Sequence, residues 1–247
     1  MDRMIYIAMT GAKQTMLQQA SISHNLANVS TTAYKAEANA FRALPVHGEG
    51  AATRTFVVDS TVGADLREGP LQQTGRDLDV AVQGKGWIAV QTEDGSEAFT
   101  RNGSLTVGVN GQLQTRSGQV VAGDAGPIAI PPDVRITIGR DGTISIIPDG
   151  TPLTTVAVIG RIKLVNPPEA DLVKGTDGLF RRRDGAPVQA DANVRVQSGA
   201  LEGSNVNVVE SMVGMINMAR QYEMQLKLVQ NADANARQAS QLLNLNA

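Results

Sequence analysis

Few residues of this chain have the type and spacing that catalysis or metal binding requires. Asp77 and Asp79 alternate along a strand-like run, so their carboxylates could face one side, as in an acid–base pair. No other group nearby supports such a pair. His24 and His47 lack the spaced partners of a zinc site, and the chain has no cysteine. We therefore expect no catalytic, cofactor-binding or metal-binding residue.

Two further short motifs are typical of structure rather than of ligand binding. Gly84-Lys85-Gly86 has a glycine spacing found in phosphate loops, but no phosphate-loop or dinucleotide pattern surrounds it. We expect a turn there, before a strand that begins at Trp87. The basic run Arg181-Arg182-Arg183 has no aromatic residues between its members and is typical of a solvated strand or turn.

Charge and hydropathy exclude several classes of partner. The formal net charge is −2, which does not favour binding to nucleic acid or to an anionic membrane. No apolar run is long enough to span a bilayer. Met4 to Ala12 is apolar, but no small-residue cleavage site follows closely, so we expect no cleavable signal peptide. A small-molecule substrate is not expected either.

An amphipathic helix is predicted over residues 3–28, with Asp2 as its cap. It is followed by a stretch to Lys35 that is dense in Asn, Ser and Thr, residues that favour helix ends. The predicted polar face is rich in amides rather than charges. The predicted apolar face consists of Ile5, Ala8, Met9, Ala12, Met16, Ala20 and Ala27.

A second long helix is predicted from Asn207 to the end of the chain. Asn207 with Glu210 is a capping-box pattern. At 1.5 Å per residue the helix would be roughly 55 Å long, so it needs a long partner. We predict that the two terminal helices pair as a coiled coil, with Leu226 in the seam. The seam positions in strict three-four alternation are Met212, Met215, Ala219, Tyr222, Leu226 and Val229.

The middle of the chain reads as antiparallel β-structure, so the predicted fold class is α+β. Short β-branched runs alternate with dipeptides that suit type I′ hairpin turns. We expect an irregular barrel or sandwich. The turn dipeptides are Asp94-Gly95, Asn102-Gly103, Asn110-Gly111, Asp141-Gly142, Asp149-Gly150, Asp177-Gly178 and Asp184-Gly185.

The predicted organisation has four parts. Residues 1–35 form the N-terminal helix and its Asn-rich ending, and residues 36–75 form a connecting segment. In that segment a helical pattern fades at Leu44-Pro45, and Thr55 to Ser60 is a candidate strand. Residues 76–200 form the β-rich outer domain, and residues 201–247 form the returning helix.

Three separated blocks of the sequence resemble the bacterial flagellar basal-body rod and hook (axial) protein family. The first is Asn25-Leu26-Ala27-Asn28 with Thr31-Thr32-Ala33-Tyr34-Lys35, where the family usually has glycine in place of Ala33. The second runs from Asp77 to Val90 and continues with Phe99-Thr-Arg-Asn-Gly-Ser-Leu; the third is Ser204 to Met212. The opening, Met1 to Ala12, is similar to the proximal-rod member rather than to the distal-rod member.

The resemblance implies a structural subunit of the flagellar rod. Such subunits polymerise with their own copies and with other rod proteins into a torque-transmitting drive shaft. Their terminal helices line an axial tube, and the β-domain lies outside it. They are exported unfolded by the flagellar type III apparatus, without signal cleavage, and assemble in the periplasm as part of the basal body.

Two alternatives remain open at this point. One is another axial component, from the distal rod or the hook; the other is a glycan-binding or enzymatic β-domain with helical oligomerisation arms. For the rod subunit, the expected assembly residues lie on the two helices and in the Asn-rich motif. They are Ile5, Met9, Met16, Asn25, Leu26, Asn28, Tyr34, Met212, Met215, Tyr222, Leu226, Val229 and Leu243.

Overall fold

The computed structural model describes residues 2–45, 55–148 and 156–244 and divides into two compact units. The helical unit contains Met1–Asn28, Glu37–Gly63 and Val206–Ala247. The β unit contains Val29–Ala36 and Ala64–Asn205. The predicted turn at Asp149-Gly150 and the histidine His47 lie outside the described residues.

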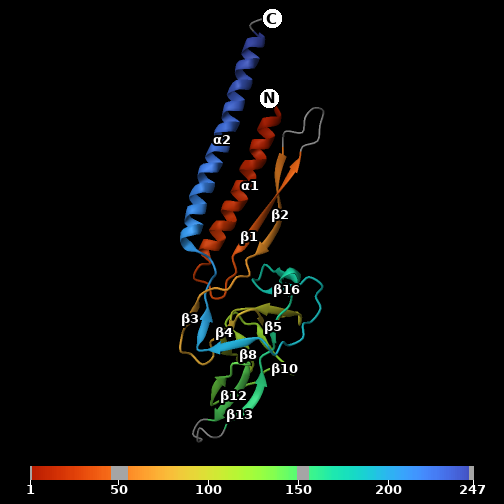
Figure 1. Cartoon of the computed structure of the whole chain (residues 1–247), viewed down its shortest axis with the longest axis vertical. Helices are drawn as coiled ribbons and strands as arrows, with labels where there is room; N and C mark the ends of the chain where they lie inside the picture. The colour runs from red at the N-terminus through yellow and green to blue at the C-terminus, as the bar shows by residue number, and fades with distance from the viewer. Residues whose placement is uncertain (1, 46–54, 149–155, 245–247) are drawn as a thin grey trace. The chain divides into compact units, whose positions relative to one another are not determined.

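Two long helices dominate the helical unit and lie side by side in opposite directions (Figure 1). Helix α1 spans Asp2–Ala27 and helix α2 spans Val208–Asn244, close to the predicted bounds. The predicted cap of α2 is confirmed, because Asn207 Oδ1 accepts the backbone N–H groups of Val209 (3.0 Å) and Glu210 (3.2 Å).

The contact between the helices is made by small and polar residues. The Thr15 hydroxyl donates to Gln225 Oε1 at 3.2 Å, and the Gln225 amide lies over Gly11. Closer to the β unit along the chain, Ile22 lies against Gly214. The contact is tightest at Gly11, where an added Cβ would lie 3.0 Å from Gln225 Nε2, whereas one at Gly214 would meet Ile22 Cδ1 at an ordinary van der Waals distance of 3.4 Å.

The predicted packing face of α1 is therefore wrong for the pairing within the chain. Met9 and Met16 are 55% and 63% exposed, and Leu226 of α2 is 45% exposed. The seam passes through Gln225, one residue before the predicted Leu226. On α1 the seam passes through Gly11 and Thr15 rather than Met9 and Met16. On α2 three of the predicted seam positions are half-buried, Met215, Ala219 and Val229, whereas Met212, Tyr222 and Leu226 are exposed.

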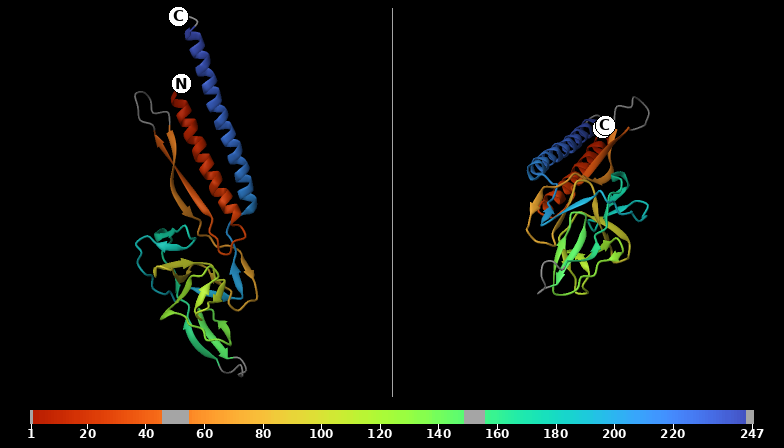
Figure 2. Two further views of the ribbon diagram at one scale, coloured as in Figure 1. Left: turned by 180° about the vertical axis from the view of Figure 1, so that it is seen from behind. Right: turned by 60° about the horizontal axis from the view of Figure 1, so that its bottom comes forward.

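A β-hairpin completes the helical unit, where the sequence suggested a fading helix and a short strand. Strand β1 spans Glu37–Pro45 and pairs with β2, which spans Thr55–Ala64 (Figure 2). The helical pattern near Leu44 is overridden because the β-branched run of β2 provides a pairing partner.

The β unit is built mainly from one nine-stranded sheet, in the order β15-β16-β6-β5-β9-β8-β7, with β10 on β9 and β14 on β5. Every pairing whose register is described is antiparallel, as predicted. Its strands are β5 (Trp87–Gln91), β6 (Glu97–Thr100), β7 (Leu105–Val107), β8 (Leu113–Thr115), β9 (Val120–Gly123), β10 (Gly126–Pro127), β14 (Leu164–Val165), β15 (Leu172–Lys174) and β16 (Phe180–Arg182).

Three smaller sheets and the 3₁₀ turn η1 (Glu169–Asp171) complete the described part of the β unit. One sheet contains β11 (Val134–Ile138), β12 (Thr143–Pro148) and β13 (Ala157–Arg161). Another pairs β17 (Arg195–Ser198) with β4 (Val80–Gln83), and the last pairs β18 (Ala200–Glu202) with β3 (Leu71–Gln73). The β-structure therefore begins before residue 76 and ends after residue 200, the bounds predicted for the β-rich domain.

The core of the β unit is aliphatic, with one small aromatic cluster. Ile88, Leu105 and Leu113 are fully buried among valines and isoleucines from most of the strands. On the other side of β5, the rings of Trp87 and Phe180 lie 4.5 Å apart between centroids. The core therefore forms despite the low aromatic content.

The hairpin turns differ from the predicted type I′ geometry. At Asp94-Gly95, Asp141-Gly142 and Asp177-Gly178 only the glycine has a positive φ, whereas type I′ needs two such residues. Gly95 N–H donates to Thr92 O at 2.9 Å, as in a type I turn followed by a glycine bulge. Bonds from Thr92 and Ser96 to the Asp94 carboxylate lower its pKa to about 2.

The close packing of β4 predicts a strong effect of a single methyl group. A Cβ added at Gly103 would lie 1.8 Å from Val80 O, whereas one at Gly160 would meet only Ile128 at 3.7 Å. We expect Gly103→Ala to cost about 3 kcal/mol in unfolding free energy and Gly160→Ala less than about 1 kcal/mol. Urea denaturation followed by Trp87 fluorescence measures both; equal losses would contradict the packing described.

Candidate functional site

The two carboxylates considered for acid–base chemistry do not form a pair. Asp79 is 4% exposed and is bound to Arg76, with Arg76 Nη1 3.1 Å from Asp79 Oδ1. Asp77 is exposed, and its backbone carbonyl accepts the Ser198 hydroxyl at 3.3 Å. One carboxylate is thus held in a structural ion pair, and the other lies in solvent.

The remaining motifs have structural positions. Gly84 to Gly86 forms the predicted turn between β4 and β5. Arg181 is bound to Asp177 at 2.6 Å at the end of a hairpin. Across the described residues, no group of three or more His, Asp or Glu side chains is arranged to hold a metal ion. Nor is any described helix both long and apolar enough to cross a membrane.

The unusual chemistry of the β unit is a buried network of one carboxylate and two cations. The Glu202 side chain is 1% exposed and receives Lys35 Nζ at 2.6 Å and Arg101 Nη1 at 2.9 Å. Gly69 N–H also donates to Glu202 Oε1, at 3.0 Å. Lys35 is fully buried as well, with its side chain 0% exposed.

Both cations also donate to backbone carbonyls. Lys35 Nζ donates to Arg67 O at 2.6 Å. Arg101 Nε donates to Gly86 O at 2.9 Å, and a second guanidinium nitrogen donates to Gly84 O. Arg101 also lies over the Trp87 ring, with Cζ 5.6 Å from its centroid. A buried charge is tolerated only when it is paired in this way.

Burial and pairing shift the pKa values of this network in defined directions. Burial lowers the pKa of Lys35, and the bond to Glu202 opposes that shift only in part. For Glu202, burial would raise the pKa, but the bonds from Gly69, Lys35 and Arg101 outweigh it and lower the pKa. Glu202 is therefore held as a carboxylate.

The network fastens together the segments by which the chain passes between its two units. We call residues 33–36, 64–69 and 202–205 the crossing segments, since the unit boundaries lie at or next to them. Asn205 adds to the network: its Oδ1 accepts Ala36 N–H at 2.8 Å, and its Nδ2 donates to Asp65 O at 2.7 Å. Ala33 N–H donates to Glu202 O at 2.8 Å.

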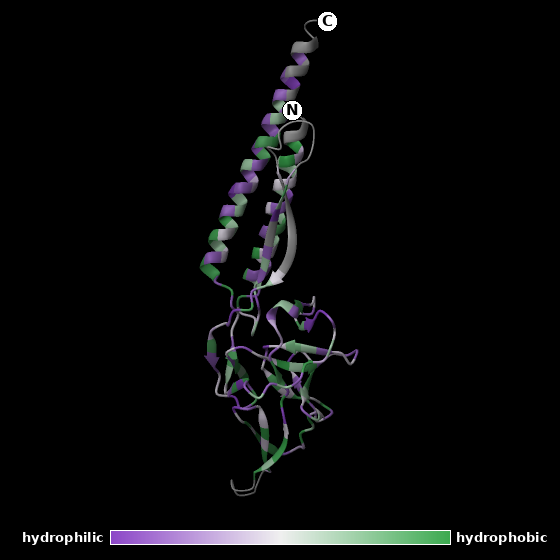
Figure 3. Ribbon diagram, turned by 45° about the vertical axis from the view of Figure 1, so that its right-hand side comes forward, coloured by the Kyte–Doolittle hydropathy of each residue, from purple (hydrophilic) through white to green (hydrophobic). Residues whose placement is uncertain are grey.

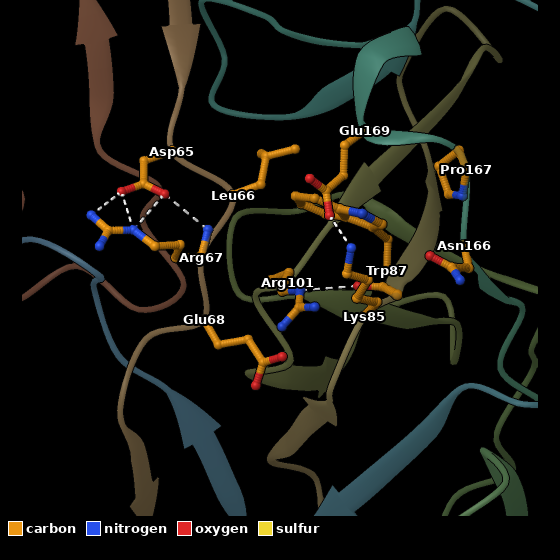
Figure 4. Close-up of a pocket in the computed structure, with 11 residues that line it drawn as sticks. Asp65, Leu66, Arg67, Glu68, Lys85, Trp87, Arg101, Asn166, Pro167 and Glu169 are labelled. Atoms are coloured by element: carbon orange, nitrogen blue, oxygen red, sulfur yellow. Dashed lines mark hydrogen bonds and ion pairs between the residues drawn. The ribbon is translucent and has the colours of Figure 1, made fainter.

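A cavity of about 340 Å³ lies beside the network (Figure 4). Four of its charged side chains form two ion pairs, Lys85 with Glu169 at 2.8 Å and Arg67 with Asp65 at 2.5 Å. Arg101, which is bound to Glu202, and the exposed Glu68 also line it, so both signs of charge are present. Trp87 lines it but is only 4% exposed. The cavity therefore offers neither a surface of one charge nor an open aromatic face to a ligand.

The predicted assembly residues divide by exposure. Met9, Met16, Met212, Tyr222 and Leu226 are exposed on the helices. Half-buried positions are Ile5, Leu26, Asn28, Tyr34, Met215 and Val229. Leu243 lies within α2, but its side chain is outside the described part of the structure.

Two of the predicted assembly residues act within the chain. Asn25 is 9% exposed; its Oδ1 accepts Glu37 N–H at 2.8 Å, and its Nδ2 donates to Glu37 O at 3.0 Å. The Asn28 amide donates to His24 O at 2.9 Å. The Asn25 amide thus joins the end of α1 to the start of β1, so it does not supply the free amide that the motif suggested for bonding neighbours.

Sequence reasoning did not identify the network, although each member carried a local signal. Lys35 ends an uncharged stretch, Arg101 follows the buried strand β6, and Glu202 shares an inward strand position with Ala200. Charged residues at inward positions indicate a buried pair. The partners cannot be matched from one sequence, because Lys35 and Glu202 stand 167 residues apart.

Removing the shared carboxylate should be the most damaging change in the network. Glu202→Gln leaves two buried cations without a counter-charge, so we expect a loss of about 3–5 kcal/mol in unfolding free energy. Lys35→Met leaves Glu202 paired with Arg101 and should cost less. Lys85→Gln, which removes an exposed pair, should change stability by less than about 0.5 kcal/mol. Urea titration gives the order, and a larger loss for Lys35→Met would contradict it.

The effect of Glu202→Gln also depends on pH with a definite sign. The folded-state pKa of Glu202 lies below its usual value of 4.5, so the unfolded chain takes up the proton first on acidification. The stabilisation is present above this value and is lost below it. The stability difference between the wild type and Glu202→Gln should therefore shrink from about pH 6 to about pH 3.

The backbone conformation of Ala33 predicts a substitution that stabilises the protein. Its φ is +56°, a left-handed conformation that glycine adopts without strain. We expect Ala33→Gly to stabilise the protein by about 0.5–1 kcal/mol, since strain relief exceeds the added chain entropy. Ala36→Gly, at a neighbouring position without positive φ, should destabilise it. Thermal melts compare the two, and stabilisation by Ala36→Gly alone would contradict the assignment.

Comparison with known proteins gives the family of this chain. Residues 197–242 match the model described as flagellar basal body rod FlgEFG protein C-terminal, and residues 81–146 match that of the flagellar hook protein FlgE/F/G D1 domain. Arg101 lies in the second match and Glu202 in the first.

Full-length relatives agree with these matches. The chain is 51% identical to the flagellar basal-body rod protein FlgF of Escherichia coli (strain K12), over 99% of this chain and 100% of that protein. It is 49% identical to FlgF of Salmonella typhimurium, with the same coverage, and 31% identical to FlgG of Buchnera aphidicola subsp. Schizaphis graminum, over 96% and 98% of the two chains. The chain therefore belongs to the bacterial flagellar basal-body rod protein family, as a structural subunit resembling FlgF.

Proposed function

We propose that this rod protein forms part of the proximal rod and joins its own copies and other axial proteins through the outer faces of its two terminal helices. The helices pair as a coiled coil that lines the axial tube, and the β unit lies outside it. The identity to FlgF exceeds that to FlgG, which supports the proximal rod over the distal rod or hook.

The observation that carries this proposal is the apolar surface of the helices. On α1, four large apolar side chains are exposed to solvent, from 46% of the surface for Leu17 to 63% for Met16; the other two are Tyr6 and Met9. Hydrophobic positions recur along α2 as well (Figure 3). The exposed apolar side chains of α2 are Val208, Val209, Met212, Val213, Ile216, Tyr222, Met224, Leu226 and Leu228. Covering such a surface on assembly is favourable at about 25 cal/mol per Å².

Assembly also supplies the burial that the helix pair lacks. Among the described side chains, α1 buries only Thr15 and Asn25, and α2 buries none. Most of the stability of a helix in a protein comes from packing, so these helices gain their full order only when neighbours surround them. This agrees with export of an unfolded chain by the flagellar type III apparatus and assembly in the periplasm, without signal cleavage.

The enzymatic or glycan-binding alternative loses its motivation. It depended on Asp77 and Asp79, and Asp79 is engaged with Arg76.

Placing a charge on either outer helix face should block assembly without unfolding the chain. Met16→Asp and Leu226→Asp each put a carboxylate on a surface that neighbours cover, at a cost of several kcal/mol per interface. We expect loss of swarming when either variant replaces the chromosomal copy. Purified monomer should keep the wild-type urea midpoint of the β unit.

The matched control is Gln230→Asp, which adds the same charge at an exposed polar position of α2. It should assemble at wild-type or modestly reduced levels. Normal swarming of both Met16→Asp and Leu226→Asp would show that these faces do not bind neighbours.

A further inference from the structure

A polar contact lies inside the seam between α1 and α2. Thr15 is 5% exposed, and its hydroxyl shares its hydrogen between Gly11 O at 3.0 Å and Gln225 Oε1 at 3.2 Å. A half-buried amide stabilises a helix pair less than leucine would. Its usual effect in such a seam is to make one arrangement of the helices better than the others.

Gly11 provides the space that this amide occupies. A Cβ at residue 11 would lie 3.0 Å from Gln225 Nε2 and 3.4 Å from Gln225 Cδ. Glycine inside a helix is destabilising relative to alanine, so its presence needs a packing reason. The Gln225 amide lying against the bare backbone of Gly11 supplies that reason.

A second contact, between Ile22 and Gly214, is made in the same alignment of the helices. A Cβ at Gly214 would lie 3.4 Å from Ile22 Cδ1. Gly11 and Ile22 are as far apart in sequence as Gly214 and Gln225, and the helices run in opposite directions. Both contacts therefore form together in one register, and both are lost together in any other.

The rest of the seam discriminates weakly between registers. The half-buried residues of α2 on this side include Met215, Met218 and Ala219. Methionine adapts to irregular partners and alanine makes few specific contacts, so a slide by one turn would cost these residues little. A slide by four residues would bring the Gln225 amide level with Ile7 or Thr15, each of which has a side chain where Gly11 has none.

We infer that Gln225, seated over Gly11 and bonded to Thr15, selects the register in which the two terminal helices pair. The register decides which apolar side chains of α1 and α2 lie level with each other on the outer surface. Gln225 is thus a specificity residue for assembly. Only this last consequence rests on the proposed function; the register itself does not.

The absence of cysteine from the chain makes the register directly measurable by disulfide cross-linking. Ile22→Cys with Gly214→Cys reports the register described. Ile22→Cys with Met218→Cys, and Ile22→Cys with Glu210→Cys, report slides by one turn in either direction. Each pair is oxidised in the full-length monomer and in isolated rods, with Gln225 unchanged, with Gln225→Leu, and with Gln221→Leu. Gln221 is exposed on the same helix and serves as the matched control.

With Gln225 unchanged, the in-register pair should cross-link at least about tenfold more than either slid pair, in monomer, rods or both. Gln225→Leu should keep the helical circular dichroism but reduce this preference to about threefold or less. Gln221→Leu should leave the preference unchanged.

Two results would overturn the inference. One is a preference that survives Gln225→Leu intact; the other is the absence of the in-register cross-link from both monomer and rods. Swarming of the same strains is scored separately, so a failure of the assembly proposal is distinguishable from a failure of the register.

Discussion

The burial of one carboxylate between two cations is the interaction on which the β unit depends. Glu202 holds Lys35 and Arg101, and the same three residues bind the backbone at Gly69, Arg67, Gly84 and Gly86. Each charge is acceptable in the interior only because the others are present. The chain passes between its units through segments that this network binds to one another. Such an arrangement keeps these segments at fixed positions relative to the sheet.

In the helical unit, by contrast, few of the described side chains of the two helices are buried. Its seam contains glycine, threonine and glutamine beside half-buried methionines, while most of the large apolar side chains of the two helices, Met9, Met16 and Leu226 among them, are exposed. A monomer built this way gains little from its own helix pairing, because the apolar area is still exposed to water. The buried charges thus fix the fold of the β unit, and the exposed apolar surface is the one that we propose neighbouring subunits cover.

The sequence predicted the elements better than the contacts. Both long helices, the Asn207 cap and the antiparallel middle follow from periodicity, capping chemistry and turn residues, which are local properties. The α1 packing face could not be predicted, because hydrophobic spacing finds an apolar stripe without saying whether the chain or a partner covers it. The prediction of a fading helix at Leu44 was wrong for a related reason, because β1 forms a strand only by pairing with β2. Lys35 and Glu202 stand 167 residues apart, so the sequence shows a charged residue at each inward position but does not show which residue pairs with it.

Native-state hydrogen exchange tests most directly whether this network fixes the crossing segments. The amides of Ala33 and Gly69 lie in irregular loops, yet both donate to Glu202, at 2.8 Å and 3.0 Å. If the network is as firm as the core, they should exchange only through global unfolding, with the same free energy as the Ala89 amide inside β5. Rapid exchange at Ala33 and Gly69, with Ala89 still protected, would show that the crossing segments open independently and would contradict this account.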